Sequence, residues 1–198
     1  APDPARPVDD PIDATLIIGD KALALDRLQA PAWDLGEAWT AWSGLPFVWA
    51  PSTDKAAHFR FVLDELGKTQ PDLVVLARYM QVLPPELIDR YPSRIINIHP
   101  SLLPYYPGAN AYRQAFEEGV RVCGCTAHFV TEQLDQGPVI LQDVFHIKVG
   151  EDTLEDVKSR GKALESEVLA RAVQLFVTDQ LVVKDKKVIF RPGMSPVP

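Results

Sequence analysis

The sequence predicts an α/β protein in which helices cover both faces of a mainly parallel sheet, giving three layers. Short apolar runs rich in β-branched residues alternate along the chain with amphipathic segments, which is the pattern of strands connected by helices. The 198-residue chain is 46% hydrophobic and 24% charged, enough to bury a core. We expect one α/β domain over residues 13–198, after a linker or disordered segment at residues 1–12.

The first elements are predicted from apolar runs and helix caps. Residues 14–18 form a continuous apolar run, typical of a buried strand. A capping-box pattern opens a helix at 34–44, and a short apolar run at 46–50 predicts the next strand. The segment 52–66 has a helical apolar face with a Ser or Thr cap at its start, and Gly67 is expected to end it.

The middle of the chain repeats the alternation. The run at 73–77 is the clearest buried strand, and the proline pair at 84–85 begins a helix that reaches Tyr91. The β-branched run at 95–98 predicts another strand, followed by a helix at about 110–118.

The last third predicts two more strands, a long helix and a hairpin. Strands are expected at 125–130 and 139–147. Thr153 opens an amphipathic helix that reaches about Phe176. Two short apolar runs flank charged residues at 184–187 and indicate a terminal hairpin.

Charge and cysteine content limit the partners. The formal net charge is −7 and no basic stripe is present, which disfavours nucleic acid and anionic membranes. No apolar run approaches the length of a membrane span. Cys123 and Cys125 cannot bridge comfortably along one strand, and reduced thiols are usual in the cytoplasm. We expect a cytoplasmic protein with a small-molecule partner, and a homo-oligomer stays open.

Polar side chains suited to catalysis cluster near the strand at 95–98. Asn97 and His99 are two residues apart and therefore point to the same face, and Pro100 stops the ladder because proline has no amide hydrogen. Open parallel sheets bind ligands at the carboxyl ends of strands. An amide and an imidazole there, with Asp135 in a later turn, can stabilise an oxyanion and move a proton. The combination suggests acyl-group chemistry.

Each candidate also has a structural interpretation. Alone, His99 would more often be a structural histidine, and Asp135 lies among Gly and Pro as ordinary turn residues do. His128 stays ambiguous. Cys123 and Cys125 would face away from His128, so a zinc site is geometrically awkward and small buried thiols are favoured. No metal is expected.

Four ordered motifs follow one another along the chain: LARYMQVL at 76–83, IINIHPSLLP at 95–104, GANAY at 108–112 and TAHFVTEQLDQGP at 126–138. Together they resemble the formyltetrahydrofolate deformylases, which share their catalytic domain with the glycinamide ribonucleotide formyltransferases. The resemblance covers about residues 49–190 and implies the formyltransferase, Rossmann-like fold.

The resemblance implies hydrolysis of 10-formyltetrahydrofolate to tetrahydrofolate and formate, with the folate as substrate and no prosthetic group. Asn97, His99 and Asp135 fall on the catalytic residues of the family. The walls of its folate pocket fall on Met80, Gln81, Val82, Leu83, Val130 and Leu134.

Two departures from the family leave alternatives. Pro100 stands where the deformylases usually have a second histidine. Proline at this position is closer to the transferase version and leaves formyl transfer to an amine open. Residues before about 49 instead resemble a fragment of the menaquinone-pathway chorismate dehydratase. We therefore expect a chimera, natural or engineered, of a foreign segment at 13–49 and a formyltransferase-like portion at 50–198. Such a protein could fold and bind folate with little or no turnover.

Overall fold

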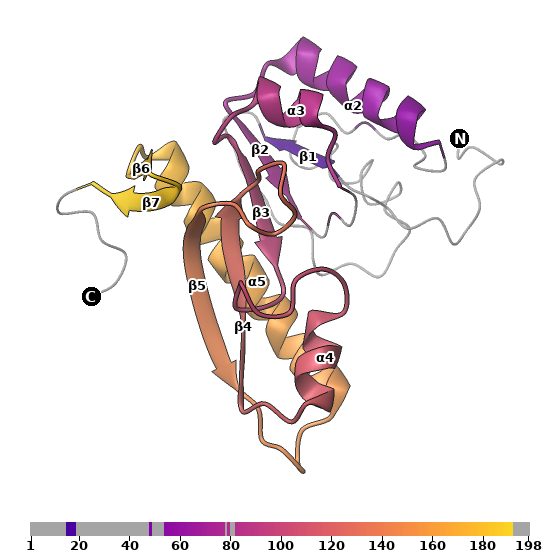
Figure 1. The fold of residues 1–198 in the computed structure, drawn as a ribbon, viewed down its shortest axis with the longest axis vertical. Coiled ribbons are helices and arrows are strands. Elements are labelled where there is room, and N and C mark those ends of the chain that lie inside the picture. The colour runs from indigo at the N-terminus through magenta and orange to yellow at the C-terminus, as the bar shows by residue number, and fades with distance from the viewer. Residues whose placement is uncertain (1–14, 19–47, 49–53, 78, 80–81, 192–198) are drawn as a thin grey trace, which may run out of the picture.

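Figure 1 shows the computed structural model, which describes residues 15–18, 48, 54–77, 79 and 82–191. The linker predicted at 1–12, the helix predicted at 34–44 and most of the strand predicted at 46–50 lie outside these residues. The elements are β1 (Thr15–Ile18), α2 (Lys55–Thr69), β2 (Leu73–Leu76), α3 (Pro85–Arg90), β3 (Ile95–His99), α4 (Ala111–Glu117), β4 (Val122–Phe129), β5 (Val139–His146), α5 (Leu154–Val177), β6 (Leu181–Lys184) and β7 (Lys187–Phe190).

Five strands form one sheet in the order β1-β2-β3-β4-β5, and β6 pairs with β7 in a hairpin. The α/β class and its layers are confirmed. The expectation of mainly parallel pairing is corrected for the described strands, because β2–β3 is parallel whereas β1–β2, β3–β4 and β4–β5 are antiparallel. Residues 130–138 are too few for the crossover that parallel neighbours need, so β5 turns back beside β4.

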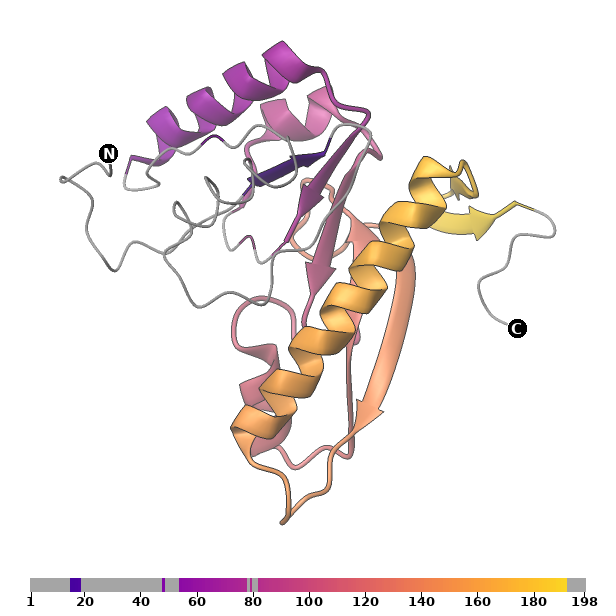
Figure 2. The ribbon, with the colours of Figure 1, turned by 180° about the vertical axis from the view of Figure 1, so that it is seen from behind.

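Helices lie on both faces of this sheet. Figure 2 shows α5 crossing one face, and Figure 1 shows α2 and α3 near the end of β2 on the other side. Because successive side chains of a strand point to opposite faces, β2 contributes to two cores. Leu73 and Val75 pack toward α5, whereas Val74 and Leu76 pack with residues of α2 and α3. This alternation explains why β2 is an uninterrupted apolar run.

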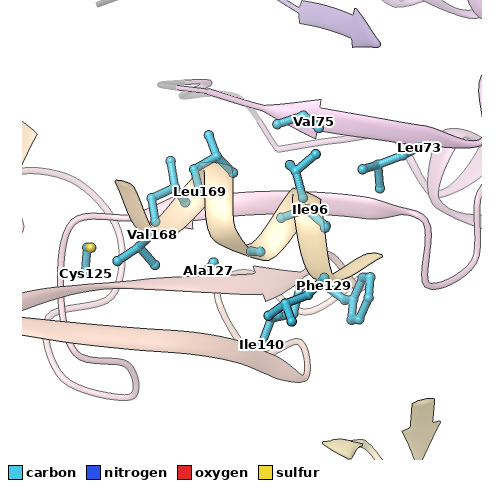
Figure 3. Packing of buried hydrophobic residues seen from close by; sticks show 13 residues of the cluster. Leu73, Val75, Ile96, Cys125, Ala127, Phe129, Ile140, Val168 and Leu169 are labelled. Atoms are coloured by element: carbon cyan, nitrogen blue, oxygen red, sulfur yellow. The ribbon is translucent and has the colours of Figure 1, made fainter. Parts of the chain in front are cut away.

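The core between α5 and the sheet fixes which face of β4 is polar. Figure 3 shows this core, with Val168 of α5 beside the strands. Cys125, Ala127 and Phe129 all belong to it, which confirms that these residues share one face. His128 therefore points to the opposite face, the one that carries Asn97.

The ends of α2 differ from the prediction. Asp54, rather than residue 52 or 53, caps the helix through its side chain. The helix continues through Gly67 and ends at Gln70, whose φ of 44° is left-handed. Glycine inside a helix costs only about 1 kcal/mol relative to alanine, so it need not end one. Here its missing side chain leaves room for Arg90.

β1 belongs to the segment expected to be foreign, and the strand predicted at 14–18 is confirmed over Thr15–Ile18. It lies at the edge of the sheet and pairs antiparallel with β2, with Ile18 opposite Leu73. Across the described residues, the helices are too short or too polar to cross a membrane.

Candidate active site

A cleft with a volume of about 430 Å³ opens at the carboxyl end of β3. Asn97 and His99 both line it, which confirms that they share a face. The apolar part of its wall includes Leu76 at the end of β2 and Ile88 of α3. The position agrees with the rule that open α/β sheets bind ligands beyond the carboxyl ends of their strands.

His99 is 5% exposed, and both of its ring nitrogens face oxygen atoms. Nε2 lies 2.9 Å from the backbone oxygen of Tyr106, and because a carbonyl only accepts, Nε2 carries the hydrogen. Nδ1 lies 3.5 Å from Oδ2 of Asp135. Both nitrogens can donate at once only in the doubly protonated ring. A hydrogen on Nδ1 in that form of the ring would face the carboxylate of Asp135.

Asp135 is held by the turn that follows β4. Its φ of 53° is left-handed, a conformation that aspartate tolerates better than most residues, and its Oδ2 accepts from the backbone N–H of Gly108 at 2.9 Å. Gly137 packs the turn closely, because a Cβ there would lie 1.6 Å from the Phe129 oxygen. Asp135 is thus a turn residue, as its neighbours suggested, whose carboxylate also faces His99.

His128 joins the site, although its sequence position left it ambiguous. It pairs directly opposite Asn97, and its Nε2 lies 3.3 Å from Asn97 Nδ2 and 3.9 Å from Asp135 Oδ1. Burial lowers the pKa of His128, although its bond to the Phe129 oxygen and the charge of Asp135 act in the opposite direction. A neutral ring that donates from Nδ1 to that oxygen, at 3.0 Å, accepts from the Asn97 amide at Nε2. Strand register is the signal that would have identified this residue.

Four of the six predicted wall residues line the cleft, namely Val82, Leu83, Val130 and Leu134. The other two, Met80 and Gln81, lie outside the described residues. Val82 is 64% exposed and Leu134 is 55% exposed. Large apolar side chains left open around a cleft indicate a surface for an apolar ligand.

The cysteines and the remaining histidines do not join this arrangement. Cys123 and Cys125 are free and buried, and burial raises the pKa of Cys125 to about 12. His58 is buried in α2, and His146 is exposed at the end of β5. Within the described ranges, no group of three His, Cys, Asp or Glu side chains could hold a metal ion.

The arrangement suits acyl-group chemistry. The distances from Asp135 to the two histidines, 3.5 and 3.9 Å, are longer than a normal hydrogen bond. Catalytic hydrogen bonds often tighten only when the substrate binds. Asn97 and His99 can then donate to a developing oxyanion while Asp135 accepts a proton.

Comparison with known proteins gives consistent relatives. Residues 10–173 match the family described as formyl transferase. A formyltetrahydrofolate deformylase of Escherichia coli (strain K12) is 44% identical over 132 residues, which are 67% of this chain and 47% of that protein. Another, of Bacillus subtilis (strain 168), is 45% identical over 127 residues, 64% of this chain and 42% of that protein. The chain spans about half the length of these curated relatives.

Two solved structures share the fold. A formyltetrahydrofolate deformylase from Pseudomonas syringae pv. tomato str. DC3000 has a TM-score of 0.74 and 40% identity, covering 78% of this chain and 52% of that one. Glycinamide ribonucleotide transformylase 1 from Symbiobacterium toebii has a TM-score of 0.73 and 37% identity, covering 83% and 77%. The foreign origin of 13–49 stays a prediction, although the family match begins at residue 10. With a match over most of its length, the chain belongs to the formyl transferase family.

Proposed function

We propose that the chain hydrolyses 10-formyltetrahydrofolate to tetrahydrofolate and formate. The observation that carries the proposal is the placement of His99 between the Tyr106 oxygen and Asp135, beside Asn97, in an apolar cleft. The deformylases at 40–45% identity support the choice of substrate and reaction. The proposal includes a cytoplasmic location, supported by the two free buried cysteines.

In the proposed reaction, the oxygen of a water molecule forms a bond with the formyl carbon, and the bond from that carbon to N10 then breaks. The formyl oxygen becomes an oxyanion in between. The free N–H of Asn97 and the protonated His99 donate to it, which lowers the barrier because these donors are already in place. Asp135 accepts a proton from the attacking water, and one proton reaches N10 as it leaves. The second proton of the water goes to solvent when formic acid ionises.

The folate would lie along the apolar wall of the cleft. Val82 and Leu134 are exposed at this wall, while Leu83 and Val130 line it more deeply. We include Met80 and Gln81 in the same wall, because both belong to the motif at 76–83. Covering these side chains would contribute about 25 cal/mol for each Å² of apolar surface removed from water.

A second candidate is formyl transfer to an amine. Pro100 lines the cleft at the position where the deformylases usually have a histidine, and the second structural relative is named a glycinamide ribonucleotide transformylase. In that reaction an amine nitrogen forms a bond with the formyl carbon, and the same donors stabilise the oxyanion. The bond from that carbon to N10 then breaks, the amine loses one proton, and one proton reaches N10. A third candidate, from the predicted chimera, is a protein that binds folate with little turnover.

One assay separates the three candidates. Purified protein is mixed with 10-formyltetrahydrofolate, with and without glycinamide ribonucleotide, and formate and tetrahydrofolate are both measured. Equal amounts of the two products indicate hydrolysis, whereas tetrahydrofolate that appears without formate, and only with the amine, indicates transfer. Calorimetric binding of a non-hydrolysable folate analogue without either product would support the third candidate. Absence of both binding and products would refute the folate proposal.

A further inference from the structure

Tyr106 connects the catalytic histidine to an acidic residue of another element. Its backbone oxygen accepts from His99 Nε2 at 2.9 Å, and its hydroxyl donates to Oε2 of Glu118 at 2.5 Å. The bond to Glu118 raises the pKa of Tyr106 to about 12, so the hydroxyl keeps its hydrogen across the neutral range. Tyr106 thus binds the His99 ring through its backbone oxygen and Glu118 through its hydroxyl.

The position of Glu118 is unfavourable for α4 itself. Glu118 is the C-cap of this helix, directly after Glu117, and the last turn carries no basic residue. Negative charge at a helix C-terminus meets the negative end of the helix dipole, which costs about 0.3–1 kcal/mol. Helix stability therefore does not account for a carboxylate there, whereas the bond from Tyr106 gives it a partner.

The backbone around Tyr106 needs such an anchor. Its φ of 52° is left-handed, which costs a non-glycine residue about 1–2 kcal/mol, so an unrestrained loop would turn the carbonyl elsewhere. The loop is bound on either side, where Ser101 Oγ donates to the Tyr105 oxygen and Gly108 N–H donates to Asp135. Between these two bonds, the Tyr106 side chain is held by its bond to Glu118 and by packing against the hydrophobic cluster that includes Tyr112.

We propose that Tyr106 and Glu118 are positioning residues that hold a backbone carbonyl against His99 Nε2, so that Nδ1 faces Asp135 and the reacting atoms. Neither residue lines the cleft, so they act through His99 and do not touch the substrate. The effect on turnover rests on the proposed hydrolysis, whereas the effect on the His99 ring does not.

The ring of His99 has two other titratable neighbours. Asp135 faces Nδ1 from the turn after β4, and His128 of β4 lies nearby, its pKa lowered by burial and also by the charge of His99. Neither contacts Glu118 in the hydrogen bonds and ion pairs of the described residues. Removing the Tyr106–Glu118 bond should therefore change the Nε2 side of the ring and leave the Asp135 side in place.

The test uses Tyr106→Phe, Glu118→Ala and their double variant. Glu118→Gln keeps an oxygen that can accept from the tyrosine hydroxyl. Glu117→Ala is the matched control, because this neighbouring glutamate pairs with exposed Arg113 at 3.7 Å and not with the loop. Two readouts are taken on the full chain: exchange of the His99 Nε2 proton with solvent in ¹⁵N-labelled protein, and kcat beside KM for 10-formyltetrahydrofolate.

We expect faster exchange of the Nε2 proton in Tyr106→Phe and Glu118→Ala, and a fall in kcat of about two- to tenfold, the equivalent of one net hydrogen bond. KM should stay unchanged. The double variant should be no worse than either single one, since both remove the same bond, and Glu118→Gln should stay near the wild type.

Exchange as slow in Tyr106→Phe and Glu118→Ala as in Glu117→Ala would overturn the proposal. Additive losses in the double variant, or a rise in KM equal to the fall in kcat, would also overturn it, because they indicate general loosening of the cleft. A protein with no turnover still permits the exchange measurement, so failure of the proposed function and failure of this inference are separate results.

Discussion

Replacing His99 with alanine should lower kcat by about a hundredfold or more if the chain hydrolyses 10-formyltetrahydrofolate. The buried ring supplies the charged donor for the oxyanion, and losing a donor or acid of this kind costs about 10²–10⁴ in rate. A hundredfold loss corresponds to about 2.7 kcal/mol of transition-state stabilisation. KM should change little, because the apolar wall that would hold the folate stays in place.

The same substitution should leave the protein folded. It removes the partner of the Tyr106 oxygen, but Asp135 keeps its bond from the Gly108 N–H. Leaving one buried polar group without a partner costs about 1–3 kcal/mol, against about 5–15 kcal/mol for the whole of a typical domain. The expected loss of activity is therefore chemical and not a consequence of unfolding.

Formate release is the assay, with urea unfolding and circular dichroism measured on each variant. His146→Ala is the matched control, because His146 is exposed at the end of β5 and does not line the cleft. A loss below tenfold in a His99→Ala protein that folds like the wild type would refute the role of His99. An equal loss in His146→Ala would show that the assay reports damage to the fold.

Three further predictions concern Asn97, two glycines and His128. Asn97→Ala should lower kcat by about a hundredfold, measured by formate release, because one oxyanion donor is lost; a rate within threefold of wild type would remove it from the mechanism. Gly161→Ala should lower the free energy of unfolding in urea by about 1–3 kcal/mol, because its Cβ would lie 2.3 Å from the Tyr112 ring. Gly67→Ala should leave it unchanged or raise it by up to about 1 kcal/mol, since the new Cβ meets only the end of a flexible side chain. Equal effects of the two would contradict this packing. Burial lowers the pKa of His128 in the folded protein, so the unfolded chain binds a proton at this residue at a higher pH. The contribution of His128 to the free energy of unfolding should therefore be full above about pH 6.5 and fall as the pH drops below that value. His128→Gln should flatten this part of the stability–pH curve, and an unchanged slope would count against it.

Local patterns were enough to predict much of the site. Asn97 and His99 share a face because the strand period is two, and the β-branched run at 95–98 fixed the strand itself. The same parity argument separated Cys125 from His128. Such inferences need only a few consecutive residues, so the rest of the fold cannot change them.

Contacts between distant segments could not be predicted in the same way. The direction of β4 depends on how the chain returns after α4, and no periodicity within β4 reports it. The partners of His99 and Asp135 in the loop after β3 are the Tyr106 oxygen and the Gly108 N–H, and every residue except proline offers such backbone groups. His128 was within reach, but only if β3 and β4 were known to pair with Asn97 opposite it.

The proposed catalytic arrangement depends on a short part of the chain. Asn97, His99 and Asp135, called the trio here, and their hydrogen-bond partners lie on β3, β4 and the loops that follow them. The β3–β4 ladder holds the two strands in register. A change of sequence before β2 cannot move these side chains relative to one another without breaking that ladder. The apolar wall differs, because it also uses the end of β2 and the segment after it, including Leu76 and Val82. If the segment at 13–49 is foreign, its effect should therefore fall on how the substrate and the attacking water are placed, where an error of about 1 Å can cost a hundredfold in rate, and not on the geometry of the trio.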